Sequence, residues 1–150
     1  MSYKHILVAV DLSKSSNVVI SKAVALASAT KSKLSFIYVD ASYESNIGYA
    51  TTAGLVKPIV AQIEADEKEK EKELLQKELQ ALTAQIDYPV TSTVVVMGKL
   101  NDKLLATVKE MDIDLLICGH HHDLWSRLFS SVHKLVNSTP ADLLIIYLDK

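Results

Sequence analysis

The chain contains few of the residues that mark several protein classes. Its 150 residues include one cysteine, four glycines and three prolines. The one cysteine, Cys118, cannot form an intrachain disulfide, and no second cysteine completes a Cys-x-x-Cys zinc or redox motif. So little glycine and proline excludes collagen-like and low-complexity structure. We therefore expect a globular protein in a reducing compartment.

Long apolar segments and an excess of one charge are also missing. The longest uninterrupted apolar run, Leu143–Leu148, has six residues, whereas a membrane-spanning helix needs about 20. Near the start, Ile6–Val10 is too short for the core of a secretory signal. Sixteen basic and eighteen acidic side chains leave a net charge of −2, which provides no field to attract nucleic acid. We expect a cytoplasmic protein that binds neither membranes nor nucleic acid.

Apolar residues make up 49% of the chain, and the length suits a single domain over residues 1–150. Five short runs rich in Val, Ile and Leu alternate with longer segments of helical spacing. The runs are Ile6–Val10, Leu34–Val39, Val90–Met97, Leu115–Cys118 and Leu143–Leu148. This alternation predicts an α/β fold, with a five-stranded parallel open sheet and helices on both faces.

Three of the intervening segments have the spacing of ordinary amphipathic helices. The first begins near Ser13 or Ser15, either of which can cap it. Its core-facing stripe is expected to be Val18, Val19, Ala23, Leu26 and Ala27. The third covers Leu100–Met111, and the fourth covers Ser130–Asn137, because Pro140 prevents continuation.

The second helix is unusually charged. From Glu64 to Glu78 the chain carries seven acidic residues and four lysines, with strict alternation over Glu67–Glu73. Alternation places opposite charges three residues apart and like charges four apart, so attraction and repulsion partly cancel. We favour a solvated helix face over a docking surface for a partner. The apolar residues expected to anchor the two ends are Ile59, Ile63, Leu74, Leu75, Leu79 and Leu82.

A candidate ligand site lies beyond the carboxyl ends of the strands. Open parallel sheets bind ligands there, at the point where strand order reverses. With the expected strand order 3-2-1-4-5, strands one and four are neighbours, and Asp11 and Gly119 meet across the crevice. Asp11 can accept a hydrogen bond from a ribose or an adenine, or it can cap the first helix, and residue type favours the cap. Val39 and Asp40 line the same edge.

Three consecutive histidines raise metal binding as an alternative. His120, His121 and His122 follow Gly119 and precede Asp123. Adjacent side chains point in different directions, so at most two of the three histidines can reach one ion. We therefore favour hydrogen-bonded rim histidines and expect no metal. Cys118, inside an apolar run, is expected to be a buried small hydrophobe rather than a nucleophile.

Ser130 and Ser131 form a second candidate for anion binding. They open the last expected helix, where backbone N–H groups can hold a phosphate, although the same serines can cap the helix without a ligand. A phosphate cradle normally needs glycine, and none follows Gly119. The chain also lacks Gly-x-Ser-x-Gly, Walker-type and His-Glu-x-x-His motifs. Residue types alone therefore indicate no catalytic residues and name no reaction.

Several segments together carry a family resemblance that spans essentially the whole chain. They are Tyr3–Ser13, Asp114–Asp123, Trp125–Ser126, Ser130–Ser131 and Ala141–Ile146. In this order they resemble the bacterial universal stress protein family, and in particular its universal stress protein A branch. The resemblance implies an adenine-nucleotide alpha-hydrolase-like fold, a cytoplasmic homodimer whose last strands pair, and a role under starvation or other stress. Pairing would cover an apolar edge strand, with Leu144, Ile146 and Leu148 at the interface.

ATP-binding members of this family carry Gly-x2-Gly-x9-Gly-Ser/Thr after the fourth strand. Here Gly119 matches the first glycine, but His122 and Ser130 stand at the other two, followed by Ser131. Seven residues instead of nine separate His122 from Ser130. An imidazole at 122 occupies space through which backbone approaches phosphates, and a shorter loop wraps them differently. The resemblance therefore implies a member without ATP, similar to those that are serine or threonine phosphoproteins.

Two function hypotheses follow. The first is a non-enzymatic, dimeric stress-response protein that acts through contacts with partner proteins and needs no cofactor. The second is an ATP-binding switch or slow ATPase whose pocket keeps Asp11, Val39, Gly119, Ser130 and Ser131. The sequence leaves open the partner, the stress signal, the phosphoacceptor and the role of the segment Ala41–Leu55.

Overall fold

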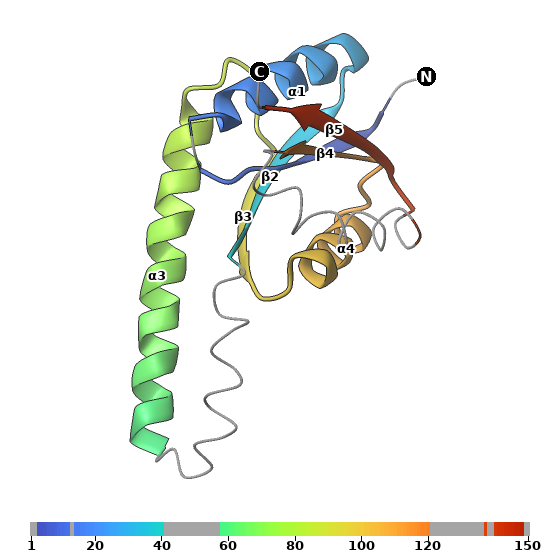
Figure 1. The fold of residues 1–150 in the computed structure, drawn as a ribbon. Coiled ribbons are helices and arrows are strands. Elements are labelled where there is room, and N and C mark those ends of the chain that lie inside the picture. The colour runs from blue at the N-terminus through green and yellow to red at the C-terminus, as the bar shows by residue number, and fades with distance from the viewer. Residues whose placement is uncertain (1–2, 13, 41–57, 121–136, 138–139, 149–150) are drawn as a thin grey trace.

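A computed structural model describes residues 3–12, 14–40, 58–120, 137 and 140–148, with the backbone alone for residues 58–65 and 120. Its elements in chain order are β1 (His5–Ala9), α1 (Ser16–Thr30), β2 (Lys33–Asp40), α3 (Pro58–Ala84), β3 (Ser92–Met97), α4 (Leu100–Glu110), β4 (Leu115–His120) and β5 (Asp142–Tyr147). The five strands form one parallel sheet in the order β3-β2-β1-β4-β5. The predicted fold class and strand order are confirmed (Figure 1). The helix expected over Ser130–Asn137 and the segment Ala41–Leu55 lie outside the described residues.

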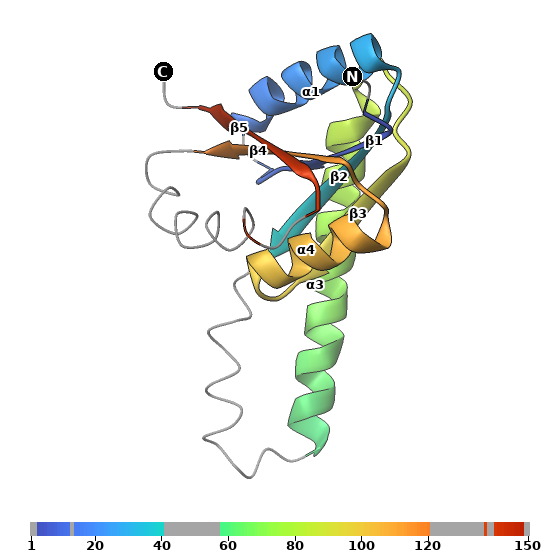
Figure 2. The ribbon, with the colours of Figure 1, turned by 90° about the vertical axis from the view of Figure 1, so that its right-hand side faces the viewer.

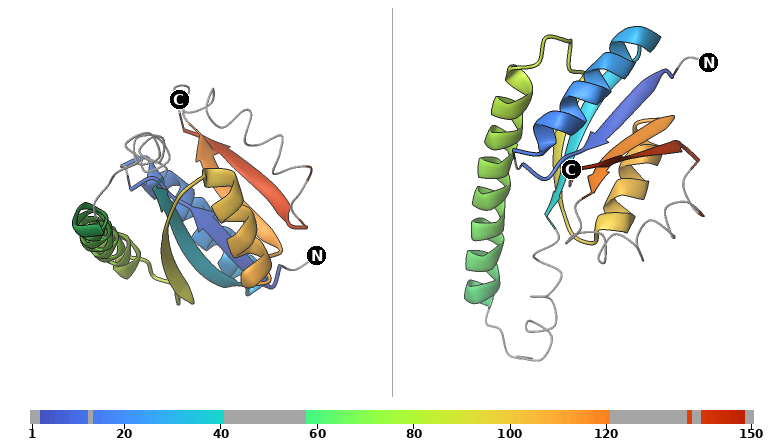
Figure 3. Two further views of the ribbon diagram at one scale, coloured as in Figure 1. Left: turned by 90° about the horizontal axis from the view of Figure 1, so that it is seen from below. Right: turned by 45° about the horizontal axis from the view of Figure 1, so that its top comes forward.

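The sheet separates two apolar clusters, and each cluster is covered by different helices. One contains Val19 and Ala23 of α1, Leu79 of α3 and the side chains of β1 and β4 that point the same way. The other contains Leu104 and Val108 of α4, packed on the opposite face of the sheet. Figure 3 shows α1 and α3 on one side and α4 on the other. Because both faces are buried, β1 and β4 contain the continuous apolar runs Ile6–Ala9 and Leu115–Cys118.

Helix α1 begins close to the predicted position but presents a different face to the sheet. Its N-cap is Ser15, whose backbone has helical dihedral angles and whose hydroxyl makes no capping hydrogen bond. The buried positions are Ser16, Val19, Ile20, Ala23 and Ala27. Val18 is 44% exposed, so its predicted place in the core is wrong. Neighbouring helical residues point about 100° apart, and Val18 falls opposite the stripe centred between Val19 and Ala23.

Among the side chains of helix α3 that the structure describes, those that pack on the sheet lie in its second half. Leu79 is fully buried, Leu75 and Leu82 are partly buried, and the Gln76 amide donates hydrogen bonds to the backbone oxygen and the hydroxyl of Thr93 on β3. Leu74 is 59% exposed and does not anchor the helix as expected. The expected anchors Ile59 and Ile63 have side chains outside the described set.

The first half of α3 extends beyond the carboxyl ends of β2 and β3. The helix has 27 residues, a length of about 40 Å, whereas the six residues of β3 span about 20 Å. Figures 1 and 2 show this part of the helix projecting past the sheet. Every residue from Asp66 to Leu74 is exposed. The alternating charges are therefore exposed, which fits both a solvated face and a docking surface.

The amino end of β1 is fixed by the carboxylate of Asp114, which lies just before β4. Its Oδ2 accepts a hydrogen bond from the backbone N–H of Lys4 at 2.7 Å, and its Oδ1 accepts one from the backbone N–H of His5 at 2.9 Å. Hydrogen bonds to a charged acceptor are shorter and stronger than neutral ones. Asp114 thereby sets where β1 enters the sheet beside β4.

The overhang of α3 predicts uneven hydrogen exchange along one helix. Amides of residues 66–74 have no packed face beneath them, so they should exchange on the order of tenfold or more faster than those of residues 75–84. Native-state exchange followed by mass spectrometry measures both halves, and α1 provides an internal reference. Equal protection along α3 would contradict this reading of its packing.

Candidate functional site

Strands one and four end side by side at the carboxyl edge of the sheet, as the predicted strand order requires. β1 and β4 are hydrogen-bonded neighbours, with Ala9 beside Cys118. Beyond the end of β1, the backbone N–H of Val10 donates to the carbonyl of Ile37 at 3.0 Å, so the chain stays in the sheet for one more residue. Asp11 lies just beyond the end of β1, whereas Gly119 lies within β4, paired with Ile146 of β5, because β4 continues past the predicted end at Cys118.

Asp11 closes the turn between β1 and α1. Its Oδ1 accepts a hydrogen bond from the Ser16 hydroxyl at 2.7 Å, and its backbone N–H points to the same hydroxyl oxygen at 3.4 Å. Between them Leu12 has φ of 63°, in the left-handed region that a side chain disfavours. Asp11 is exposed and Ser16 is 2% exposed. The exposed carboxylate therefore binds the hydroxyl of the first residue of α1, but the N-cap is Ser15, so Asp11 is not the helix cap that residue type favoured.

Two side chains lie so close to Gly119 that they leave no room for a Cβ atom at this position. A Cβ at this position would lie 2.6 Å from Cγ2 of Val19 on α1 and 2.8 Å from Cδ1 of Leu148, closer than non-bonded carbon atoms approach. The space on the α1 side of Gly119 is thus filled by the protein itself. The first glycine of the nucleotide motif has a packing reason that requires no ligand. Sequence reasoning missed both Val19 and Leu148 as parts of this site.

The other candidates at this edge point to opposite faces of the sheet. Val39 packs in the α4 cluster, whereas Tyr38 and the buried Asp40 belong to alternate positions on the α1 side. Burial raises the pKa of Tyr38, and the negative charges of Asp40, Asp11, Glu78 and Glu71 raise it further. Four carboxylates, from Asp11, Asp40 and helix α3, therefore act on one phenol near this edge.

Cys118 is not a nucleophile. Its side chain packs against the α4 cluster, and burial raises the pKa of its thiol to about 12. A thiol with that pKa is protonated at neutral pH and is therefore unreactive.

Three predicted site residues, His122, Ser130 and Ser131, lie outside the described residues, as do His121 and Asp123. The steric argument about positions 122 and 130 consequently stays a prediction. In the part of the chain that the structure describes, no cluster of three or more His, Cys, Asp or Glu side chains is arranged to hold a metal ion. None of the described helices combines the length and apolar character that crossing a membrane requires.

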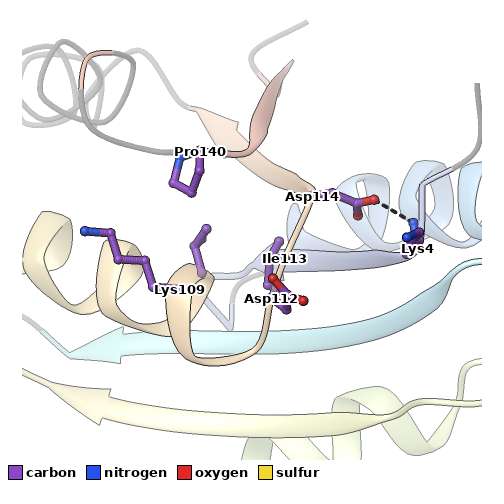
Figure 4. Close-up of a pocket in the computed structure, with 7 residues that line it drawn as sticks. Lys4, Lys109, Asp112, Ile113, Asp114 and Pro140 are labelled. Carbon is purple, nitrogen blue, oxygen red and sulfur yellow. Dashed lines mark hydrogen bonds between the residues drawn. The ribbon is translucent and has the colours of Figure 1, made fainter.

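A shallow cavity of about 500 Å³ lies at the opposite, amino edge of the sheet. Its lining is Lys4, Val108, Lys109, Asp112, Ile113, Asp114 and Pro140 (Figure 4). The figure shows Asp114 turned toward the Lys4 backbone rather than into the cavity. With that carboxylate engaged in holding β1, the cavity offers no convergent set of polar groups for a ligand.

The interface residues expected on β5 differ in exposure. Leu144 is 40% exposed, Ile146 is 5% exposed within the core of its own chain, and Leu148 is partly buried beside Gly119. β5 pairs with β4 on one side and is an edge strand of this sheet. The exposed apolar surface of the strand is therefore Leu144 together with Tyr147, which is 45% exposed.

The strand order and the site at the carboxyl edge define an α/β protein of the nucleotide-binding type of architecture. A sequence profile of the universal stress protein family matches residues 2–146. The chain is 38% identical over 146 residues to universal stress protein A of Salmonella typhimurium LT2 and of Escherichia coli K12, covering 97% of this chain and 95% of each relative. The chain belongs to the universal stress protein family.

A solved structure of a universal stress protein in complex with cAMP has the same fold. It superposes with a TM-score of 0.61 at 20% sequence identity, covering 99% of this chain and all of the other. At this level of identity the likeness extends to the fold.

Close packing at Gly119 predicts a clear effect of adding one methyl group. Gly119→Ala should destabilise the protein by about 1–3 kcal/mol, because the β-branched Val19 cannot turn aside within its helix. Urea unfolding measures the change. The double variant Gly119→Ala, Val19→Ala is the matched control. Its loss in free energy of unfolding should be smaller than the sum of the losses in the two single variants. An unchanged or increased stability of Gly119→Ala would show that the contact is absent.

Proposed function

We propose that the protein is a non-enzymatic stress-response protein of the cytoplasm that does not bind ATP and acts as a homodimer through contacts with partner proteins. The observation that supports this most is the filled space at Gly119, where Val19 and Leu148 occupy the α1 side of the β4 tip. The carboxylates of Asp11 and Asp40 at the same edge add a negative field. Both features disfavour a triphosphate at this edge.

Regulation by phosphorylation on serine or threonine belongs to the same proposal. The departures from the family's nucleotide motif at His122 and Ser130 support it, because the resemblance links that loop to phosphoproteins. Ser130 and Ser131 are candidate acceptors.

Adenine-nucleotide binding is the second candidate. It is favoured by the fold, which the chain shares with a universal stress protein in complex with cAMP, and by the outward side of Asp11, which can accept a hydrogen bond from a nucleoside. On this candidate, Asp11, Val39, Gly119, Ser130 and Ser131 would form the pocket of a switch or slow ATPase.

Nucleotide titration separates the two candidates. We expect calorimetric titration with ATP and Mg²⁺, and separately with cAMP, to give no saturable heat, and we expect neither ligand to change the melting temperature. A ligand present at 100 times its Kd would stabilise the fold by about 2.7 kcal/mol. A low-micromolar Kd for either nucleotide would replace the first candidate by the second.

The dimer requires a separate test at β5. The chain should elute with twice its mass of 16.5 kDa in size-exclusion chromatography with light scattering, because pairing covers an apolar edge strand. Leu144→Lys should shift the equilibrium toward monomer by placing a charge in the interface. Leu74→Lys is the matched control, since Leu74 is 59% exposed on α3 and should leave the mass unchanged. A monomeric wild-type chain, or equal behaviour of the two variants, would contradict dimerisation through β5.

A further inference from the structure

A half-buried histidine at the amino edge of the sheet connects three elements. The ring of His5, on β1, lies with Nε2 2.7 Å from the Ser35 hydroxyl on β2 and with Nδ1 3.2 Å from the carbonyl of Met111. Met111 is the C-cap of α4, which covers the α4 face of the sheet. The carboxyl-edge site and the family motif use none of these groups.

The neutral ring satisfies both partners in one tautomer. Nδ1–H then donates to the Met111 carbonyl, and Nε2 accepts from the Ser35 hydroxyl. Ser35 is fully buried, and it occupies an alternate position to Phe36, on the same face as Ile37 and the α4 cluster. The hydroxyl therefore sits against apolar side chains and depends on the ring as its acceptor.

Protonation disturbs this arrangement. An imidazolium has two N–H donors, so the Ser35 hydroxyl would have to turn its own hydrogen toward apolar surroundings, where an unsatisfied donor is unfavourable. Alternatively the charged ring moves into solvent, and then both the Ser35 hydroxyl and the Met111 carbonyl lose their hydrogen bond with the ring. The first response keeps Nδ1–H on the Met111 carbonyl and leaves only the Ser35 hydroxyl unsatisfied, whereas the second response separates the end of α4 from β2.

The surroundings of His5 shift its pKa in both directions. Burial lowers the pKa of His5 below its ordinary value of 6.5, the Met111 carbonyl raises it, Lys33 on β2 lowers it, and Asp114 before β4 raises it. Burial is the largest of these influences and sets the net direction. Because the unfolded chain then binds the proton more readily, this contribution to stability is complete well above pH 6.5. It is lost as the pH falls through 6.5 toward the lower value in the fold.

We propose that His5 is an acid-sensitive latch, whose neutral ring ties the carboxyl end of α4 to the buried Ser35 hydroxyl and whose protonation releases that end. The latch lies beside the amide of Ile113, which donates to the carbonyl of Val108, and the amide of Met111, which donates to the carbonyl of Thr107. These two amides report whether the end of α4 is attached. The consequence is a local opening of the α4 face under mild acid, with the carboxyl edge unaffected.

Solution NMR on the full-length chain tests the latch. The His5 ring, assigned by its loss in His5→Gln, should titrate below pH 6.5. Hydrogen exchange at Met111 and Ile113, corrected for the intrinsic rate, should accelerate on the order of tenfold between about pH 7 and pH 5. In His5→Gln, which cannot titrate, the corrected exchange at these amides should be the same at both pH values.

Ser35→Ala distinguishes the latch from a merely structural histidine. Without the Ser35 hydroxyl, protonation of the ring no longer leaves a buried donor unsatisfied. The pKa of His5 should therefore be higher in Ser35→Ala than in the wild-type protein. A His5 ring that titrates at or above 6.5, corrected exchange that is independent of pH in the wild-type chain, or an unchanged His5 pKa in Ser35→Ala would each overturn the proposal.

Discussion

The close approach of α1 and the last strand to Gly119 is the contact on which the carboxyl edge of the sheet depends. Because residue 119 has no Cβ, Val19 and Leu148 can both rest on the β4 backbone. This contact joins α1, β4 and Leu148, which follows β5. A glycine that matches the nucleotide motif thus has a packing role, and the proposed function takes the space beside it to be closed to a nucleotide.

Carboxylates hold β1 at both of its ends, and this leaves the two edges of the sheet with different chemistry. At the carboxyl edge, Asp11 binds the Ser16 hydroxyl and contributes to a field that disfavours anions. At the amino edge, Asp114 is engaged by two backbone N–H groups. His5 at this edge has hydrogen bonds that bridge β1, β2 and the end of α4. The proposed absence of ATP binding concerns the first edge, and the proposed response to protons concerns the second.

The sequence predicted the sheet well because each buried strand is a short apolar run and the runs alternate with helical spacing. It did not predict the role of Asp11, whose carboxylate binds the Ser16 hydroxyl, whereas the N-cap of α1 is Ser15. Val18 and Leu74 were misplaced because an apolar residue type does not fix the direction in which a helical side chain points. The contacts of Gly119 with Leu148 and of His5 with Ser35 join distant parts of the chain. They depend on strand register, which residue types alone do not determine.

The central claim is that the protein's own side chains close the nucleotide edge, and nuclear Overhauser contacts in solution measure this most directly. The account predicts contacts from the Gly119 α-protons to the Val19 and Leu148 methyl groups in the free protein, with the same intensity under excess ATP and Mg²⁺. Absence of these contacts in the free protein, or their replacement by contacts to adenosine protons, would contradict it.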